Sequence, residues 1–550
     1  MVYRSPYPTL DIPEANILSY LFPEGTEPSD EPIWVDAKDP TNSLSPRQAL
    51  VWIKRLGALL DKLQIQKGEA VMILSPNHIF VPVAYLGIVG AGRVFSGANP
   101  IYTVSEVEYQ IRNTGARAVF AHPSLIEKTV DAAQRAGLSR EQVFQFSDRP
   151  CTSLHGIQDW REIAVSTPEY AWEPTGPAFR TTLATINYSS GTTGLPKGVC
   201  VSHYNIIANC EQTIVMRDLE TSYTPPARRQ ERWLGFLPLY HSYGQLYMCV
   251  MAPKLGVPVY IMAKFVYEDF LKALEQFRIT HLQSAPPILV MLDKRPETSK
   301  YDLSSLKNIL CGAAPLSKEL QNAVSKRFSV NIIQGWGMTE LTCGAIHVPG
   351  GRVDDSGSVG LLDPNTECRL LDDDGKEVEP GQPGEIFVRG PQVCLGYWKN
   401  AEATKEILDS EGWLKTGDIA VVKDNWFWIV DRKKELIKVN ALQVAPAELE
   451  AVLLENETVA DVAVVGITLN NEEWPRAYIT LKDDYKGKVK ADDIQEWMKG
   501  RVAKHKQLVG GIRFIDEVPK LASGKIQRKV MRDWAKRDAL EMQGNSRPKL

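Results

Sequence analysis

The chain has 550 residues, which is too long for one compact core and predicts two or more domains. Hydrophobic residues make up 44% of it and charged residues 24%, with a formal net charge of -4, an ordinary balance for a globular protein. This balance gives no sign of a surface adapted to polyanions, so we expect no nucleic acid among its partners.

The most apolar stretches are residues 79–92 and 246–266. The first is too short for a membrane span and the second is interrupted by Pro253 and Lys254, so no membrane span is expected. The eight cysteines form no C-x-x-C pair and no His/Cys cluster at metal spacing, which favours a reduced, intracellular compartment. The chain ends in Pro548-Lys549-Leu550, a weak peroxisomal-type signal in which proline replaces the usual serine, so cytoplasm and peroxisome both stay open.

Between about residues 45 and 328, predicted strands alternate with amphipathic helices. Ser45-Pro46-Arg47-Gln48 is a capping box with proline at the first helical position. Residues 70–74 form a short apolar run typical of a buried strand, and a similar strand–turn–helix unit recurs at 308–328. This alternation predicts an α/β fold whose large N-terminal domain contains parallel sheets covered by helices.

The predicted secondary-structure pattern changes twice further along the chain. Residues 356–390 contain many turn-forming residues between short runs that favour β-strands. We therefore expect a small β-barrel-like subdomain over about 356–430. From residue 431 onward, a helix beginning at Pro446 and strands near 462–465, 478–481 and 512–515 predict a smaller α+β domain. We therefore expect an N-terminal domain over 1–430 and a C-terminal domain over 431–550.

The most specific local signal is the stretch Y-S-S-G-T-T-G-L-P-K-G-V, from Tyr188 to Val199. Glycines let the backbone turn so that successive N–H groups face one concavity, and Ser/Thr hydroxyls add donors. The spacing differs from G-x-x-x-x-G-K-[ST], which excludes a Walker-type P-loop. The stretch predicts a polyphosphate-binding loop made of Ser189, Ser190, Gly191, Thr192, Thr193, Gly194 and Lys197.

Further blocks accompany this loop: N-P-I-Y-T-V-S-E at 99–106, L-P-L-Y-H-S-Y-G at 237–244 and Q-G-W-G-M-T-E at 334–340. From about residue 75 to 529 the sequence resembles the acyl-adenylate-forming (AMP-binding) superfamily, and most of all its 4-coumarate–CoA-ligase-like acyl-CoA synthetases. The resemblance implies an ATP-dependent acid–thiol ligase, which makes acyl-AMP and pyrophosphate and then passes the acyl group to coenzyme A. ATP, Mg²⁺ and coenzyme A are the implied cofactors, and a carboxylic acid is the other small-molecule partner.

The resemblance also implies which residues hold the nucleotide. Thr339 would contact the α-phosphate, and Glu340 would hold Mg²⁺, which offsets the repulsion between carboxylate and triphosphate. Asp418 would accept from both ribose hydroxyls, Arg432 would reach the ribose or the phosphate, and Trp336 would lie against adenine. The remaining nucleotide positions implied by the match are Gly312, Ala313, Ala314, Gln334, Gly335, Gly337 and Met338.

A further block, P-K-L-A-S-G-K-I-Q-R-K at 519–529, contains Lys525. A lysine in such a basic tail is by itself a solvated surface group, but the order P-x-x-x-S-G-K-I-x-R matches the catalytic lysine of the family. It would bridge the carboxylate of the acid and the α-phosphate, alongside Thr339, Glu340 and His241. Lys434 matches the interdomain hinge, which implies that the C-terminal domain is a mobile cap.

For the second half-reaction, the resemblance implies a swing of the C-terminal domain that removes the lysine and brings residues 435–444 to the site. Lys438 and Gln443 match the family there as cofactor-binding positions, but the usual Lys-Gly pair is replaced by Asn440-Ala441. A methyl group in place of glycine narrows the thiol channel slightly. The phosphopantetheine of a carrier protein therefore stays open as an acceptor beside coenzyme A.

The acid itself is predicted from the pocket positions that the match implies. His241 matches a residue that gates this pocket, so we expect it to form the pocket and not to transfer protons. No pocket position offers a charge to a substrate amine, which argues against an α-amino acid and favours an aryl, arylalkanoic or medium- to long-chain aliphatic acid. A non-catalytic nucleotide- or acyl-binding relic is the remote alternative. The implied pocket positions are His241, Tyr243, Gly244, Tyr247, Ile288, Gly335, Leu341, Thr342, Cys343 and Gly344.

Overall fold

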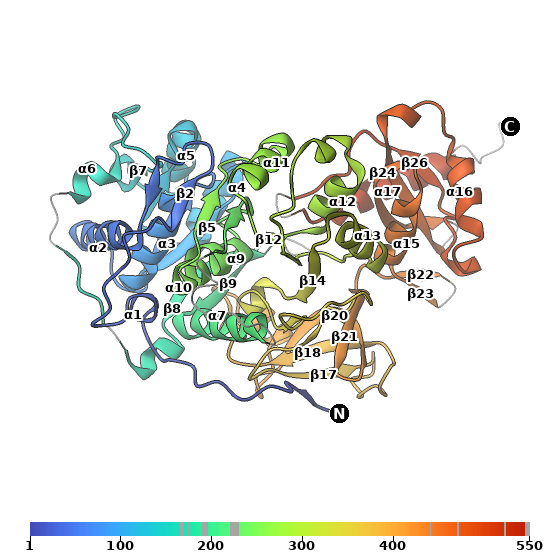
Figure 1. The fold of residues 1–550 in the computed structure, drawn as a ribbon, viewed down its shortest axis with the longest axis horizontal. Coiled ribbons are helices and arrows are strands. Elements are labelled where there is room, and N and C mark those ends of the chain that lie inside the picture. The colour runs from blue at the N-terminus through green and yellow to red at the C-terminus, as the bar shows by residue number, and fades with distance from the viewer. Residues whose placement is uncertain are drawn as a thin grey trace.

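The computed structural model describes residues 1–165, 169–173, 175–189, 196–219, 230–439, 442–469, 472–521 and 524–544. Within these residues the chain forms two largely parallel sheets, a curled antiparallel sheet and a small C-terminal α+β domain (Figure 1). This arrangement confirms the expected fold class. The mobility of the C-terminal domain stays a prediction.

The first sheet has the strand order β19-β9-β8-β5-β4-β6-β7. The strands β4, β5, β6, β7 and β8 run parallel, and β9 and β19 add antiparallel strands at one edge. Every residue of β4 and β5 is buried, as expected for parallel strands covered on both faces. The bounds are β4 Ala70–Leu74, β5 Val94–Ala98, β6 Ala118–Ala121, β7 Val143–Gln145, β8 Leu183–Ser189, β9 Lys197–Ser202 and β19 Gly396–Tyr397.

Helices cover this sheet and connect its strands. The predicted capping box is present, because Ser45 Oγ accepts from the backbone N–H of Gln48 and Gln48 Oε1 accepts from that of Ser45. The helix that follows, α2, packs on the fully buried α3. The bounds are α1 Ile17–Leu21, α2 Pro46–Lys62, α3 Phe80–Gly90, α4 Val104–Thr114, α5 Ile126–Arg135, α6 Trp160–Ala164 and α7 His203–Asp218.

The second sheet has the order β16-β15-β14-β13-β12-β10-β11-β2-β3. Its strands run parallel from β14 to β2, and β15, β16 and β3 are antiparallel to their neighbours. The strand bounds are β2 Trp34–Asp36, β3 Ser43–Leu44, β10 Trp233–Gly235, β11 Val259–Ile261, β12 His281–Ser284, β13 Asn308–Cys311, β14 Asn331–Trp336, β15 Ile346–His347 and β16 Leu361–Leu362. The associated helices are α9 Ser242–Gly244, the π-helix η4 Gln245–Met251, α10 Ala252–Leu255, α11 Tyr267–Gln276, α12 Pro286–Lys294 and α13 Lys318–Phe328.

The antiparallel sheet has the order β1-β17-β18-β20-β21 and uses the β-rich segment that the sequence predicted. One strand comes from outside that segment, because β1 (Tyr3–Arg4), at the N-terminus of the sequence, pairs with β17. Residues 415–418 lie in β20, where its pairing with β18 shifts register. The other bounds are β17 Glu367–Leu371, β18 Gly384–Arg389, β20 Leu414–Lys423, β21 Trp426–Arg432 and the nearby helix α14 Ala401–Ile407.

The C-terminal domain contains the sheet β24-β25-β26 with helices packed on it, together with the hairpin β22-β23. Figure 1 shows these elements at one end of the molecule, next to α12 and α13. The bounds are β22 Ile437–Val439, β23 Leu442–Val444, α15 Pro446–Glu455, β24 Val459–Leu469, β25 Glu472–Leu481, α16 Ala491–Lys499, β26 Ile512–Phe514 and α17 Arg528–Gly544. Among the described residues, no helix combines the length and apolarity needed to cross a membrane. The terminal tripeptide 548–550 lies outside the described residues.

The segment that contains Lys525 rests on the N-terminal domain. Leu521 N–H donates to the carbonyl of Lys525 and Gly524 N–H donates to the carbonyl of Leu521, each at 2.8 Å, which forms a tight turn. Gly524 has φ +83°, and a Cβ there would come within 3.0 Å of Pro287 at the start of α12. A residue without a side chain therefore lets this turn lie directly on the neighbouring domain.

Candidate active site

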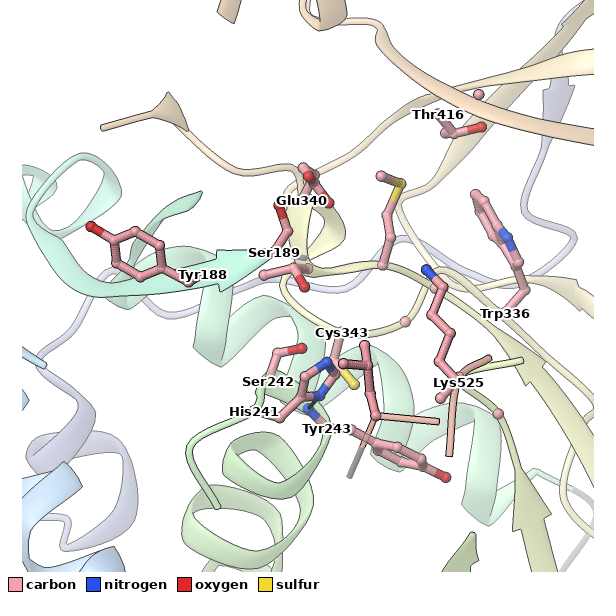
Figure 2. Close-up of a pocket in the computed structure, with 18 of the residues that line it drawn as sticks. Tyr188, Ser189, His241, Ser242, Tyr243, Trp336, Glu340, Cys343, Thr416 and Lys525 are labelled. Carbon is pink, nitrogen blue, oxygen red and sulfur yellow. Dashed lines mark hydrogen bonds between the residues drawn. The ribbon is translucent and has the colours of Figure 1, made fainter. Parts of the chain in front are cut away.

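A cavity of about 670 Å³ opens where the two parallel sheets, the antiparallel sheet and the C-terminal domain meet. Its wall is formed by the ends of β8 and β14, the start of β9, the segment before α9, and residues of β20 and β21. Lys525 enters from the C-terminal domain. In Figure 2 its side chain lies between Trp336 and the group formed by His241, Tyr243 and Cys343.

The turn after β14 presents Thr339 and Glu340 to the cavity. The turn is tight: a Cβ on Gly337 would lie 1.8 Å from the carbonyl oxygen of Cys343, so a side chain at this position cannot be accommodated without a backbone shift. Glu340 is buried, and its Oε1 accepts a hydrogen bond from the hydroxyl of Tyr397 at 2.8 Å. Lys197 Nζ lies 4.9 Å from the centre of the same tyrosine ring, so a basic group packs on the residue that binds this carboxylate.

Trp336, which lines the cavity, and Asp418, which adjoins it, form a second cluster. The indole Nε1–H of Trp336 donates to Asp418 Oδ2 at 2.8 Å, and Arg432 Nε lies 3.1 Å from Oδ1 in a direction that makes no hydrogen bond. Asp418 is buried, so Oδ1 is a desolvated carboxylate oxygen with no hydrogen-bond partner among the described residues. Such an oxygen can accept from the hydroxyl groups of a ligand that enters the cavity.

Lys525 is a basic group that the C-terminal domain contributes to the cavity. The pKa of Lys525 is lowered to about 8, first by burial, because removal from water disfavours the ammonium form, and then by the nearby guanidinium of Arg432. The carboxylates of Asp418 and Glu435 act in the opposite direction. At neutral pH the side chain remains a cation, and it is poorly solvated.

The apolar part of the cavity surrounds His241, Tyr243, Tyr247 and Cys343. Burial, with the nearby charge of Lys525, lowers the pKa of His241 to about 4, and His241 Nδ1 accepts from the N–H of Tyr243 at 3.3 Å. The imidazole is therefore neutral at physiological pH. The rings of Tyr243 and Tyr247 meet edge to face at 5.1 Å, and burial raises the pKa of the Cys343 thiol to about 12, so the thiol stays protonated.

Many residues that the sequence predicted lie in the wall of this one cavity: Ser189, Lys197, His241, Tyr243, Tyr247, Gly312, Ala313, Gly335, Trp336, Gly337, Met338, Thr339, Glu340, Cys343, Gly344, Arg432, Lys434 and Lys525. Asp418 adjoins it through Trp336. Residues 190–194 of the predicted phosphate loop, and Asn440-Ala441, lie outside the described residues.

Other predicted positions lie outside the cavity wall. Gln334 donates to the carbonyl of Leu316 and to Gln321, so its amide supports the sheet. Lys438 and Gln443 are exposed and face each other across the β22–β23 hairpin. The remaining positions away from the wall are Gly244, Ile288, Ala314, Leu341 and Thr342.

Sequence reasoning missed several residues of the wall. Tyr397, Glu385, Glu406 and His347 come from segments with no distinctive local motif, and the strand pairings that bring them here cannot be deduced from neighbouring residues. Others lay within blocks that the sequence did single out, among them Asn99, Tyr102, Tyr240 and Ser242, and Thr416 and Gly417 directly precede the predicted Asp418.

The carboxylates of the wall suit a divalent cation that is shared with a ligand. Among the described residues there is no cluster of three or more His, Cys, Asp or Glu side chains that could cage a metal ion. Mg²⁺ is commonly held by one or two carboxylates together with substrate phosphates, and the partly desolvated Glu340 fits that role.

Comparison with known proteins identifies the family of the chain. A family model described as AMP-binding enzyme matches residues 24–398, and the model of its C-terminal domain matches 448–525. The chain is 35% identical to a phenylacetyl-CoA ligase (epaB) of Aspergillus niger, with 96% of this chain and 98% of that protein covered. It is 34% identical to a probable 4-coumarate–CoA ligase of Dictyostelium discoideum, with 97% of each covered. The solved structure of ATP-bound MatB from Rhodopseudomonas palustris is similar with a TM-score of 0.83 at 25% identity, over 95% of this chain and 99% of that one.

The chain therefore belongs to the AMP-binding enzyme family and is an AMP-forming acid–CoA ligase, similar to the 4-coumarate–CoA-ligase-like acyl-CoA synthetases. The family identified from the motifs is confirmed by these matches. The particular acid and the roles of single residues are matters for proposal.

Proposed function

We propose that this cavity activates a carboxylic acid in two half-reactions. In the first, an oxygen of the acid attacks the α-phosphate of ATP, forming acyl-AMP and releasing pyrophosphate. In the second, the thiol of coenzyme A attacks the acyl carbon and AMP leaves. The observation that carries this proposal is the position of Lys525, which reaches from the C-terminal domain into a cavity whose wall holds Thr339 and Glu340.

Lys525 would stabilise the transition state of the first half-reaction. An anionic carboxylate is repelled by a triphosphate, and a buried cation between them offsets that repulsion. A positioned charge in a site that excludes water contributes roughly 3–4 kcal/mol, or about 10²–10³ in rate. Thr339, from the facing turn, would donate its hydroxyl to the α-phosphate.

Glu340 would hold Mg²⁺, and the Tyr397 hydroxyl would fix the orientation of that carboxylate. Bound there, the ion would supply charge neutralisation at the phosphate oxygens. Lys197 lies beside the same tyrosine ring and would bind phosphate directly. The three side chains would thereby define where the pyrophosphate part of ATP lies.

The nucleoside part of ATP would occupy the Trp336–Asp418 cluster. Asp418 Oδ1 is buried with an open acceptor position, which suits ribose hydroxyls, and Arg432 stands next to it. Trp336 offers an aromatic face, and the strand end at Gly312 and Ala313 offers backbone without bulky side chains on the opposite side of the cavity.

The acid would lie against His241, Tyr243, Tyr247 and Cys343. These side chains are neutral and mostly aromatic or apolar, and none offers an anion to a substrate amine, which supports an aryl, arylalkanoic or medium- to long-chain aliphatic acid. The similarity to a phenylacetyl-CoA ligase supports an arylalkanoic acid in particular. His241 would shape the entrance of this pocket and would not transfer a proton.

For thiol transfer, Lys525 must leave the cavity so that pantetheine can enter. Rotation about Lys434, which lies in the cavity wall next to the last strand of the antiparallel sheet, would exchange it for the β22–β23 hairpin with Lys438 and Gln443. Coenzyme A is the proposed acceptor, and a phosphopantetheinylated carrier protein is the alternative.

Acid-dependent pyrophosphate release from ATP tests the first half-reaction. We expect release with at least one arylalkanoic or aliphatic acid and none with α-amino acids. The absence of release across a panel of such acids would contradict the proposal. Measuring thioester yield with coenzyme A and with a phosphopantetheinylated carrier protein identifies the acceptor.

A further inference from the structure

The wall of the acid pocket contains a buried imidazole–carboxylate pair. His347 lies in β15, and its Nδ1 stands 2.8 and 3.0 Å from the two carboxylate oxygens of Asp363. Asp363 is fully buried, and the His347 side chain retains 9% exposure. A buried carboxylate is costly unless it is hydrogen-bonded, so Nδ1–H must donate to Asp363 and the ring is held in one orientation.

The opposite edge of this ring faces the cavity. His347 lines the cavity, and its Nε2 has no hydrogen-bond partner among the described residues. Two glycines of the same wall flank that edge: a Cβ on Gly344 would lie 2.9 Å from Nε2, and a Cβ on Gly335 would lie 3.4 Å from it. Any side chain at either position would cover the nitrogen, so the paired glycines leave it accessible from the cavity.

Neighbouring polar groups do not compete for this nitrogen. The hydroxyl of Tyr243 donates to the backbone carbonyl of Leu310 at 3.1 Å, and the thiol of Cys343 is a weak hydrogen-bonding group. His347 Nε2 is thus an oriented polar atom in a pocket that is otherwise mostly apolar and aromatic. Sites of this composition commonly use a small number of placed polar groups to select their ligand.

We propose that His347 selects acids that carry a hydroxyl group on the part of the molecule remote from the carboxylate, and that Asp363 is its positioning residue. This inference rests on the proposed function, in which Lys525 and Thr339 hold the carboxylate. The hydroxyl then belongs to the portion of the acid that enters between Gly335 and Gly344.

A hydroxyl fits Nε2 in either protonation state of the ring. With Nδ1–H given to Asp363, a neutral ring leaves Nε2 as an acceptor for the hydroxyl hydrogen. A protonated ring makes Nε2–H a donor to the hydroxyl oxygen. An acid without the hydroxyl would leave this nitrogen desolvated and unpaired, which is the arrangement that discriminates best against an analogue.

The test compares matched acids by pyrophosphate release. Phenylacetate and 3-phenylpropanoate are each compared with their ortho-, meta- and para-hydroxy forms, and octanoate with ω-hydroxyoctanoate. For the wild type, the best hydroxylated member of a set should exceed its parent acid in kcat/KM by roughly 10- to 100-fold.

Two variants separate recognition from folding. The double variant His347→Leu with Asp363→Asn removes the pair without leaving an unpaired buried charge, and it should bring the preference to about one. His347→Gln keeps a hydrogen-bonding group near the same place and should retain part of the preference. The ratio between matched acids is independent of the fraction of folded enzyme, so partial misfolding does not disturb it.

The outcomes are distinguishable. If the wild type releases pyrophosphate with none of the acids, the proposed function fails together with this inference. If it activates the parent acids as well as every hydroxylated form, or if the double variant keeps the wild-type preference, then His347–Asp363 only supports the β14–β15–β16 region and the inference is overturned.

Discussion

The hydroxyl of Tyr397 donates a hydrogen bond to Glu340 Oε1 across 2.8 Å, joining residues 57 positions apart in the sequence. The two meet because β19, which ends at Tyr397, pairs with β9 and lies next to the turn after β14. This hydrogen bond fixes the orientation of the carboxylate that we propose as the Mg²⁺ ligand.

Tyr397→Phe should therefore impair the metal-dependent step. Loss of a hydrogen bond to a buried carboxylate costs about 1.5–3 kcal/mol, so kcat for pyrophosphate release should fall roughly 10-fold or more. The Mg²⁺ concentration for half-maximal rate should rise. Tyr301→Phe removes a surface bond to Glu268 and serves as the matched control, which should leave both quantities unchanged.

The Trp336–Asp418 contact predicts that substitutions at these two residues raise the KM for ATP to different extents. Asp418→Ala removes the proposed acceptor of both ribose hydroxyls and should raise the KM for ATP on the order of 100-fold. Trp336→Phe keeps an aromatic face but loses the donor to Asp418, and should raise it less than about 10-fold. Steady-state kinetics with varied ATP at saturating acid measure both. An Asp418→Ala enzyme with unchanged KM would contradict the nucleotide placement.

The pKa of Lys525 predicts an alkaline limit to adenylation. Burial lowers that pKa to about 8, so the free enzyme holds the ammonium below this pH and loses it as the pH rises through this value. Acid-dependent kcat/KM should then fall by about 10-fold per pH unit above roughly pH 8. Lys525→Arg keeps its charge at all these pH values, so its activity, although lower, should not show this limb. An identical limb in both enzymes would assign it to another group.

Short sequence motifs were enough to predict those site residues that stand together in one segment of the chain. Trp336, Thr339 and Glu340 stand in one block and Lys525 in another, and their order along the chain was enough to group them. Tyr397 and His347 depend on pairings such as β19 with β9 and β15 with β14, which bring together distant segments that carry no signal of their own.

The fold shows the same division. The capped helix α2 and the buried strand β4 follow from local pattern. The pairing of β1 with β17 joins Tyr3 to Cys368, and nothing in either short segment specifies the other. Residues 415–418 lie in β20, where Lys415 pairs with Phe387 and Ile419 with Glu385, and the register shift between these two pairs is not specified by the local sequence.

Gly337 should be among the least tolerant positions of the site. Its Cβ would lie 1.8 Å from the Cys343 carbonyl oxygen, so Gly337→Ala must displace backbone and should destabilise the protein by roughly 1–3 kcal/mol or more. Gly500→Ala is the control, because a Cβ there meets no atom within 4 Å and φ is -84°. Urea unfolding measures both. Equal midpoints for the two variants would contradict the packing of this turn.

The role of Lys525 is tested most directly by measuring the two half-reactions separately in the Lys525→Ala variant. Acid-dependent exchange of pyrophosphate into ATP reports adenylation, and thioester formation from a synthetic acyl-adenylate and coenzyme A reports the second step. We expect exchange to fall by about 10²–10³ or more while thioester formation from the preformed adenylate stays within a few-fold of wild type. Exchange at the wild-type rate would contradict the role of Lys525, and with it the placement of the reacting groups in the cavity.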